Sequence, residues 1–366
     1  MTALRLPRLS WTTAVPPLAL VVLVLTWGRH LATGWVVVVA AVLAGAVLAA
    51  VHHAEVVALR VGEPYGSLVL AVAVTVIEVA LIVTLMVSGG AETESLARDT
   101  VFAAVMITTN GIAGLSLLLG ALRHGITHFH PEGSGAALAT VTTLATLSLV
   151  LPRFTSEPGP KFSAPQLGFA ATASLVLYVL FVLTQTRRHR DFFLPVTSEG
   201  TPVGEDLAQH APPPGRRAAL TSLGLLLVAL VAVVGLAKVE SPAIEDGVEA
   251  AGFPHSFVGV VIALLVLLPE TLAAARAALR ARIQISLNLA YGSAMASIGL
   301  TIPAIAIASV WLTGPLLLGL GPTQLVLLLL TVLVSGLTVV PGRATRLQGA
   351  LHLVLLAAFL FLAIIP

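Results

Sequence analysis

Long apolar runs separated by short polar turns constrain the fold of this chain more than any other feature of its sequence. A transmembrane helix needs about 20 apolar residues to cross a hydrocarbon layer about 30 Å thick. On that criterion we expect about eleven spans, and hence an all-α polytopic membrane protein. Their expected ranges are 12–28, 31–51, 64–88, 100–122, 134–151, 165–184, 217–237, 255–275, 284–312, 315–340 and 344–365.

The composition favours the same class and excludes others. Charged residues make up 10% of the 366 positions and hydrophobic residues 57%, whereas a soluble domain has about 25% charged residues. There is no cysteine, which excludes disulfides and cysteine-ligated metals. The formal net charge of +2 gives no reason to expect a nucleic-acid partner.

The basic residues predict an orientation in the membrane. With the N-terminus placed inside, 14 of the 19 Lys and Arg fall in inner segments and five in outer ones. Because inner loops are enriched in Lys and Arg, we expect a cytoplasmic N-terminus and an external C-terminus. Arg5 and Arg8 precede a short apolar run that resembles a signal peptide, but no small-residue cleavage site follows, so a retained helix is favoured.

Two glutamates lie deep inside apolar runs, and they are the main candidates for a functional site. Glu78 lies in AVAVTVIEVALIVTLM and Glu270 in GVVIALLVLLPETLAAA, whereas the other acidic residues are expected in loops or at span edges. A charge at the centre of a transmembrane helix costs about 2.5–3.5 kcal/mol, so intramembrane acids indicate function. No Lys or Arg lies at similar depth, so a cation or a proton is the expected counter-charge. Two protonated glutamates bonded within the core are the alternative.

The surroundings of the two glutamates repeat along the chain. About 30 residues after each glutamate, a helix with small and polar side chains follows. Side chains expected to assist Glu78 and Glu270 in binding a metal ion are Thr75, Thr108, Thr109, Asn110, Ser293, Ser297 and Thr301. The first copy starts from an inner loop and the second from an outer one, five helices later. This is an inverted repeat, an architecture typical of secondary transporters with a site at the membrane midplane.

Pro269, directly before Glu270, is expected to break the helix locally. A proline inside a helix frees a backbone carbonyl one turn earlier, here around Val266, and such carbonyls can bind cations where they line a cavity. We expect the Glu270 helix to be more distorted than the Glu78 helix. The ionised pair would bind a cation and the protonated pair would return without it. Proton uptake and cation release would then compete at one alternately exposed site, which is antiport.

Four segments of the chain resemble the bacterial ChaA-type calcium/proton and sodium/proton antiporters of the cation/calcium exchanger superfamily. These are residues 62–82, 109–124, 178–193 and 260–303. The resemblance covers essentially the whole chain and implies exchange of Ca²⁺, Na⁺ or K⁺ for protons in a bacterial inner membrane, with no resident cofactor. It also implies one extra N-terminal helix and two inverted five-helix repeats. The expected parts are 1–30 for the extra helix, 31–184 for the first repeat with its acid-bearing helix 64–88, 185–216 for a cytoplasmic linker, and 217–366 for the second repeat with its acid-bearing helix 255–275.

Departures from the family pattern leave the transported ion open. Related calcium exchangers have a Gly-Asn-x-x-Glu pattern, whereas Thr75 and Leu267 stand at the asparagine positions here. With fewer amide oxygens, a monovalent-cation/proton antiporter with little Ca²⁺ transport is the alternative. An intramembrane enzyme is a remote alternative, since the spans hold no aspartate and no HExxH motif. A channel would not need an inverted, acid-bearing repeat, and we expect a protein that is not an enzyme.

Two expected loops contain clusters of polar side chains whose function the sequence leaves open. His124, His128 and His130 are expected in a solvated cytoplasmic loop, with a zinc site or a pH sensor as alternatives. Residues 240–249, with four acidic side chains, are expected in a solvated external loop, with a cation-attracting mouth or a short acidic helix as alternatives. The expected partners are inorganic cations, protons and the lipid bilayer, without nucleic acid; a homo-oligomer is left open.

Overall fold

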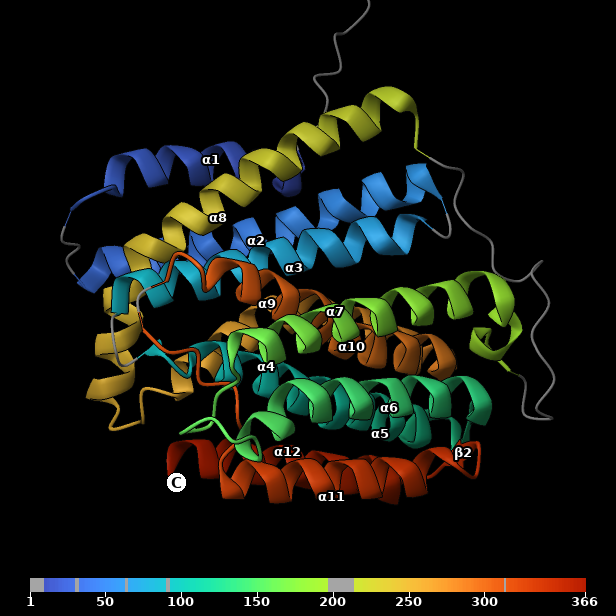
Figure 1. Cartoon of the computed structure of the whole chain (residues 1–366). Helices are drawn as coiled ribbons and strands as arrows, with labels where there is room; N and C mark the ends of the chain where they lie inside the picture. Colours follow the sequence, from blue (N-terminus) through green and yellow to red (C-terminus); the bar gives the residue numbers. More distant parts are fainter. Residues whose placement is uncertain (1–9, 30–32, 63–64, 90–92, 197–213, 313) are drawn as a thin grey trace, which may run out of the picture. The chain divides into compact units, whose positions relative to one another are not determined.

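A computed structural model of the chain describes residues 10–29, 33–62, 65–89, 93–196, 214–312 and 314–366, and within this part the chain is almost entirely helical (Figure 1). The α-helices are α1 (Trp11–Thr26), α2 (Thr33–Val61), α3 (Tyr65–Gly89), α4 (Leu96–Met106), α5 (Ala113–His124), α6 (Pro131–Ala145), α7 (Ala164–Leu183), α8 (Arg216–Ala250), α9 (Phe257–Leu279), α10 (Ile283–Ala308), α11 (Pro322–Val339) and α12 (Arg346–Ile364). The π-helical segments are η2 (Ile107–Ile112), η3 (Thr146–Val150) and η5 (Thr184–Arg188), and the 3₁₀ segments are η4 (Leu151–Arg153) and η6 (Arg190–Phe193).

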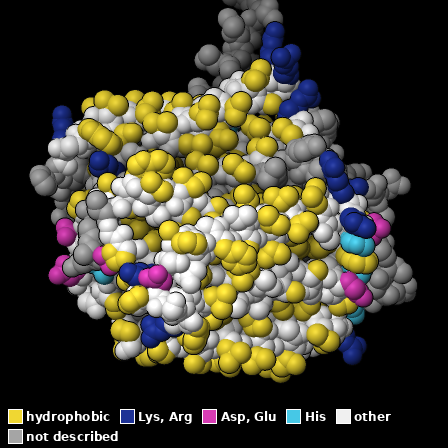
Figure 2. Space-filling model, in the orientation of Figure 1, with side chains coloured by type: hydrophobic (Ala, Val, Ile, Leu, Met, Phe, Trp, Pro, Cys, Tyr) yellow, Lys and Arg dark blue, Asp and Glu magenta, His cyan; other side chains and the backbone are white. Residues whose placement is uncertain are grey.

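The helices have the length and composition of membrane spans. Within the described residues, nine helices are long and apolar enough to cross a bilayer, and two shorter apolar helices lie at Trp11–Thr26 and Ala71–Val87. Together they match the expected set of about eleven and confirm an all-α polytopic membrane fold. Figure 2 shows hydrophobic side chains over the middle of the helices seen on that face, with charged side chains towards helix ends.

Three expected spans have different bounds in the structure. The expected span 31–51 continues to Val61, because no proline interrupts the run after His52 and the chain turns only at Gly62, where φ is 76°. The expected span 217–237 continues as α8 through Pro242 to Ala250. The expected span 315–340 is helical only from Pro322. Glycines and prolines keep residues 314–321 non-helical, and their backbone groups bond to other loops, as in Gly319 N–H to Pro160 O at 2.8 Å.

The contacts divide the chain into two compact units that do not follow the order of the sequence. The first comprises Met1–Ile77 and Pro212–Ala243, and the second comprises Glu78–Ala211 and Ile244–Pro366. The expected division into an extra helix, two repeats and a linker therefore stays a prediction. Of the expected linker, residues 197–213 lie outside the described part of the chain, as do Arg5 and Arg8.

A buried histidine joins three helices of the first unit. His53 on α2 is 3% exposed, and its Nε2 lies 2.9 Å from the backbone oxygen of Thr12 on α1. Its Nδ1 lies 3.3 Å from Oγ of Ser222 on α8. His53 therefore satisfies its polar atoms within the unit, which is the ordinary requirement for a buried imidazole.

Two helices form the centre of the second unit. The continuous helical stretch Leu96–His124, which comprises α4, η2 and α5, and helix α10 are the most buried of the described candidate spans. Small residues let neighbours approach them closely. A Cβ on Gly114 of α5 would lie 2.6 Å from Cβ of His352 on α12, and one on Gly299 of α10 would lie 2.7 Å from Cβ of Tyr178 on α7.

Candidate functional site

The two intramembrane glutamates are both buried in the second unit. Glu78 on α3 is 2% exposed and Glu270 on α9 is 9% exposed. Helix α9, which bears Glu270, packs against α10, whose Ser297 is hydrogen-bonded to Glu78. Two carboxyl groups in a low-dielectric interior repel one another when both are ionised, so a proton or a cation stabilises the pair.

Helix α10 supplies hydroxyl groups to this pair. Ser297 Oγ donates a hydrogen bond to Glu78 Oε2 at 3.0 Å. Thr301, one turn further along α10, is fully buried, and its Oγ1 has no hydrogen-bond partner. Oε1 of Glu78 also has no hydrogen-bond partner and is fully buried. A buried carboxylate oxygen and a buried hydroxyl with spare hydrogen-bonding capacity fit the oxygen-rich surroundings that Ca²⁺ and alkali cations prefer.

The polar residues Thr108, Thr109 and Asn110 lie on the π-helical segment η2, and their side chains form hydrogen bonds with other groups of the protein. Thr108 and Thr109 are buried, and their hydroxyls donate to backbone oxygens one turn earlier, at 2.7 Å to Ala104 and 2.5 Å to Val105. The Asn110 amide is fully buried and bonded to residues of α11 and α12. π-helical turns often lie at functional sites, where they change the direction of side chains by part of a turn.

The remaining predicted residues lie on the two acid-bearing helices and on α10. Thr75, three residues before Glu78 on α3, is 6% exposed, and Ser293, one turn before Ser297, is half-buried. The expected local break at Pro269 is not found, because α9 stays α-helical from Phe257 to Leu279. The role of all these side chains in ion binding stays a prediction.

Comparison with known proteins assigns the family. A model of the sodium/calcium exchanger protein family matches residues 31–187 and 221–365. The chain belongs to the sodium/calcium exchanger protein family. It is 34% identical over 349 residues to the sodium-potassium/proton antiporter ChaA of Escherichia coli, covering 94% of this chain and 93% of that protein. It is also 47% identical over 360 residues to the protein y4hA of Sinorhizobium fredii, covering 97% and 96%.

A solved structure of a distant relative confirms the fold of this exchanger-family chain. The crystal structure of the H⁺/Ca²⁺ exchanger CAX superposes with a TM-score of 0.71 at 16% identity, covering 96% of this chain and 86% of that one. At this identity the likeness shows the fold alone. Together with the family match and the apolar helices, it identifies an integral, multi-pass membrane protein.

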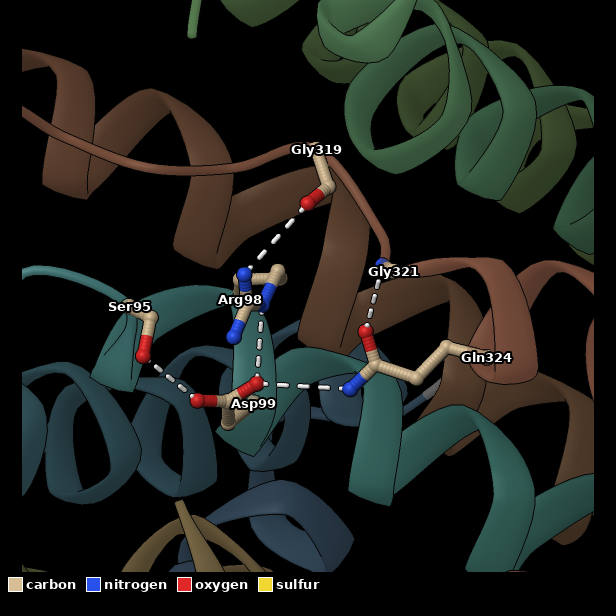
Figure 3. A network of polar contacts seen from close by, with 6 residues as sticks. All are labelled: Ser95, Arg98, Asp99, Gly319, Gly321 and Gln324. Carbon is tan, nitrogen blue, oxygen red and sulfur yellow. Dashed lines mark hydrogen bonds and ion pairs between the residues drawn. The ribbon is translucent and has the colours of Figure 1, made fainter. Parts of the chain in front are cut away.

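Two acidic residues that were expected in loops or at span edges are also buried. Asp99 is 4% exposed and Glu240 is 2% exposed. Asp99 lies in the first turn of α4, and Figure 3 shows its carboxylate between Ser95, Arg98 and Gln324. It accepts from Ser95 Oγ at 2.7 Å, Arg98 Nε at 2.8 Å and Gln324 Nε2 at 3.4 Å. Because Arg98 precedes it, Asp99 was expected in the loop before the span 100–122, although the apolar run begins directly after it.

The acidic segment 240–249 is not a loop. It forms the last turns of α8, which ends at Ala250. Glu240 is buried, whereas Asp246 and Glu249 are exposed. The expected span 217–237 ends before Lys238 because the apolar run stops there. A helix can nevertheless continue in polar sequence once its apolar part is anchored.

The three histidines His124, His128 and His130, at the end of α5 and directly after it, each contact another part of the protein. His128 belongs to strand β1 (Thr127–His128), which pairs antiparallel with β2 (Arg343–Ala344). His130 Nδ1 lies 2.7 Å from Glu132 Oε2, and His124 Nε2 lies 3.2 Å from the backbone oxygen of Leu279. Within the described residues, no group of three or more His, Asp or Glu side chains could hold a metal ion, so the zinc alternative has no support there.

Proposed function

We propose that the chain is a secondary transporter that exchanges cations for protons at a site formed by Glu78 and Glu270. The observation that carries the proposal is the pair of carboxyl groups buried within membrane spans, 2% and 9% exposed, one of which accepts a hydrogen bond from Ser297 of α10. Acidic residues buried within membrane spans are typical of proton-coupled transport sites. The names of ChaA, of CAX and of a Ca²⁺/H⁺ antiporter from Aphanothece halophytica, 24% identical, support the same reaction.

In the proposed mechanism, the protonation state of the pair decides what crosses the membrane. With both glutamates ionised, their oxygens and nearby hydroxyls replace the hydration shell of a cation. With protons bound, the pair is neutral and can face the other side without a cation. Ser297 stabilises the ionised form of Glu78, since a hydroxyl that donates to a carboxylate favours its charge.

The ions proposed as substrates are Ca²⁺, Na⁺ and K⁺. A hard oxygen site suits all three, and Ca²⁺ needs six to eight oxygens, so carbonyls and water would complete its shell. An exchanger of monovalent cations with little Ca²⁺ transport is the second candidate. It is favoured by Thr75 and Leu267, which supply no amide oxygen at the positions before the glutamates.

The topology proposed from the distribution of basic residues is a cytoplasmic N-terminus in a bacterial inner membrane. In that orientation α4, α9 and α11 begin on the external side of the membrane. Helices α6 and α10 begin on the cytoplasmic side. Cysteine labelling tests this directly, because the sequence has no cysteine of its own. A single cysteine in place of Ala250 should react with an impermeant maleimide from outside, and one in place of Arg280 should not.

Everted membrane vesicles test the exchange reaction. After a proton gradient has been established, Ca²⁺, Na⁺ and K⁺ are added separately and dissipation of the gradient is recorded. Glu78→Gln and Glu270→Gln should each abolish cation-dependent dissipation, because neither amide can release a proton or supply a charge. The matched control is Glu249→Gln, which changes an exposed acid. Full proton-coupled exchange by either glutamine variant would contradict the proposed site, and dissipation that needs no opposing cation would indicate a channel.

A further inference from the structure

A histidine in the last helix is bonded to the asparagine of η2. His352, in the middle of α12, is 0% exposed, and its Nδ1 lies 3.0 Å from Asn110 Oδ1. Its Nε2 lies 3.3 Å from Thr338 Oγ1 on α11. An amide oxygen only accepts hydrogen bonds, so Nδ1 must hold the proton that joins the two side chains.

The amide nitrogen of Asn110 also has a buried hydrogen-bond partner. Its Nδ2 donates to Thr331 Oγ1 on α11 at 2.9 Å. Asn110 and Thr331 are 0% and 1% exposed, so neither group can exchange its partner for bulk water. Rotating the amide would break two buried hydrogen bonds, and a buried polar group left without its partner destabilises the folded state.

The position of the histidine ring is fixed by close packing. A Cβ on Gly114 would lie only 2.6 Å from Cβ of His352, and one on Gly349 would lie 2.5 Å from the backbone nitrogen of Leu118. Helices α5 and α12 therefore cross with almost no space between their backbones. A side chain attached at such a crossing has few alternative positions.

We propose that His352 is a positioning residue for the transport site, and that it acts through Asn110. Segment η2 contacts α9 and α10, which bear Glu270 and Ser297, and it also contacts α11 and α12. His352 occupies one lone pair of Asn110 Oδ1 and fixes the direction of the other. Groups that orient a ligand in this way typically change metal affinity by 10–100-fold when they are removed.

The inference rests on the proposed function, because it requires Asn110 to contribute an oxygen to the cation or to its bound water. Its own test is the cation concentration that gives half-maximal dissipation of the proton gradient, measured separately for Ca²⁺, Na⁺ and K⁺ in everted vesicles. His352→Leu should raise this concentration about tenfold for the transported cation, with a maximal rate within about twofold of the parent. His352→Gln, whose amide can donate to Asn110 Oδ1, should restore most of the affinity.

Two comparisons separate positioning from a general packing effect. Ser335→Ala is the matched control, because Ser335 is a fully buried residue of α11 whose hydroxyl has no hydrogen-bond partner. It should leave the half-maximal concentration unchanged. In the double variant, Asn110→Ala with His352→Leu, the histidine change should add nothing to the effect of Asn110→Ala, since its target is absent.

The outcomes distinguish this inference from the proposed function. Equal effects of His352→Leu with and without Asn110 would overturn positioning through Asn110, and so would an unchanged affinity in Asn110→Ala. The glutamate variants test the exchange site independently of either result. If His352→Leu does not fold, Thr331→Val releases the other end of the same amide and should also raise the half-maximal concentration. An unchanged value in Thr331→Val would then overturn the proposal.

Discussion

Ser297 on α10 donates a hydrogen bond to Glu78 on α3, with an Oγ to Oε2 distance of 3.0 Å. In the sequence, Ser297 belongs to the helix that follows Glu270, not to the one that follows Glu78. The contact therefore joins the acid of the first predicted repeat to the polar helix of the second. An inverted repeat with one shared site would give this exchange of partners, since each copy then contributes to the surroundings of the other.

Removal of the Ser297 hydroxyl should weaken cation binding. A hydrogen bond to a charged group contributes about 1.5–3 kcal/mol, and the ionised form of Glu78 is the one that binds a cation. Ser297→Ala should therefore raise the half-maximal cation concentration about tenfold or more at fixed pH. The measurement is a cation titration in everted vesicles. Ser116→Ala, which removes another buried hydroxyl from the second unit, is the control and should behave like the parent.

The close crossing of α5 and α12 makes a prediction about stability. A Cβ on Gly349 would lie 2.5 Å from Leu118 N, 2.8 Å from Leu118 Cα and 2.9 Å from Gly114 O. These are backbone atoms and cannot move away as a side chain could. Gly349→Ala should therefore lower the free energy of unfolding by about 1–3 kcal/mol, seen as a lower melting temperature in detergent.

The matched control for this crossing is Gly168→Ala on α7. A Cβ there meets no atom within 4 Å, and the glycine is exposed. This variant should be as stable as the parent or slightly more stable, because alanine favours a helix by about 0.5–1 kcal/mol over glycine. Equal melting temperatures for the two alanine variants would show that α5 and α12 are not in close contact.

The class of the fold and the two acidic residues were predictable for a physical reason. Lipid provides no hydrogen-bond partners, so a span must be helical and a charge inside it is conspicuous. Ser297 and Thr301 were predicted as supporting ligands because a helix with small and polar residues follows each glutamate by about 30 residues. The sequence does not show that Ser297 contacts Glu78, because a hydroxyl on α10 can face either of two neighbouring helices. Only the packing of the helices decides between them.

His352 was missed although the sequence contains its signal. It is an ionisable residue in the apolar run ALHLVLLAAFLFLA, and the argument applied to Glu78 applies to it as well. Asp99 was missed for a different reason. Its neighbour Arg98 suggests a polar turn, and the burial of the carboxylate depends on Gln324, which is 225 residues away in the sequence. Contacts at such separation are not visible in local patterns.

The Asp99 cluster predicts a stability effect at the start of α4. Asp99 accepts from Ser95 and Gln324 and pairs with Arg98, which itself bonds to Gly319 O at 3.4 Å (Figure 3). Asp99→Ala would leave the 17%-exposed guanidinium of Arg98 without its counter-ion. We expect a loss of about 2–3 kcal/mol, below the range for fully buried pairs because Arg98 keeps some contact with solvent.

Thermal unfolding in detergent measures this loss. Asp246→Ala, which removes an exposed acid from α8, serves as the control and should change stability by less than about 0.5 kcal/mol. Gln324→Ala should have a smaller effect than Asp99→Ala, because its 3.4 Å hydrogen bond is long. If Asp99→Ala melts like the control, the cluster does not stabilise the start of α4.

A chain of amide hydrogen bonds holds the segment after α7 against the start of α10. The backbone nitrogen of His130 donates to Gln284 Oε1 at 2.6 Å, and Gln284 Nε2 donates to Asn288 Oδ1 at 2.9 Å. Asn288 Nδ2 then donates to the backbone oxygen of Phe193 at 2.7 Å. Phe193 is buried and contacts Phe181 edge to face at 5.5 Å between ring centres. Phe192 of the same segment also contacts the His130 ring at 5.0 Å between ring centres, so polar and aromatic contacts together anchor the segment.

Asn288→Ala should release the polar anchor and make this segment open more often. The loss of one hydrogen bond of about 1 kcal/mol raises the population of the open form about fivefold. Cleavage by trypsin after Arg190, followed by mass spectrometry, reports that population when cleavage is slower than closing. Gln348→Ala, which alters a cap at the start of α12, is the control. Equal cleavage rates in both variants would mean that the aromatic contacts of Phe192 and Phe193 hold the segment without the amide chain.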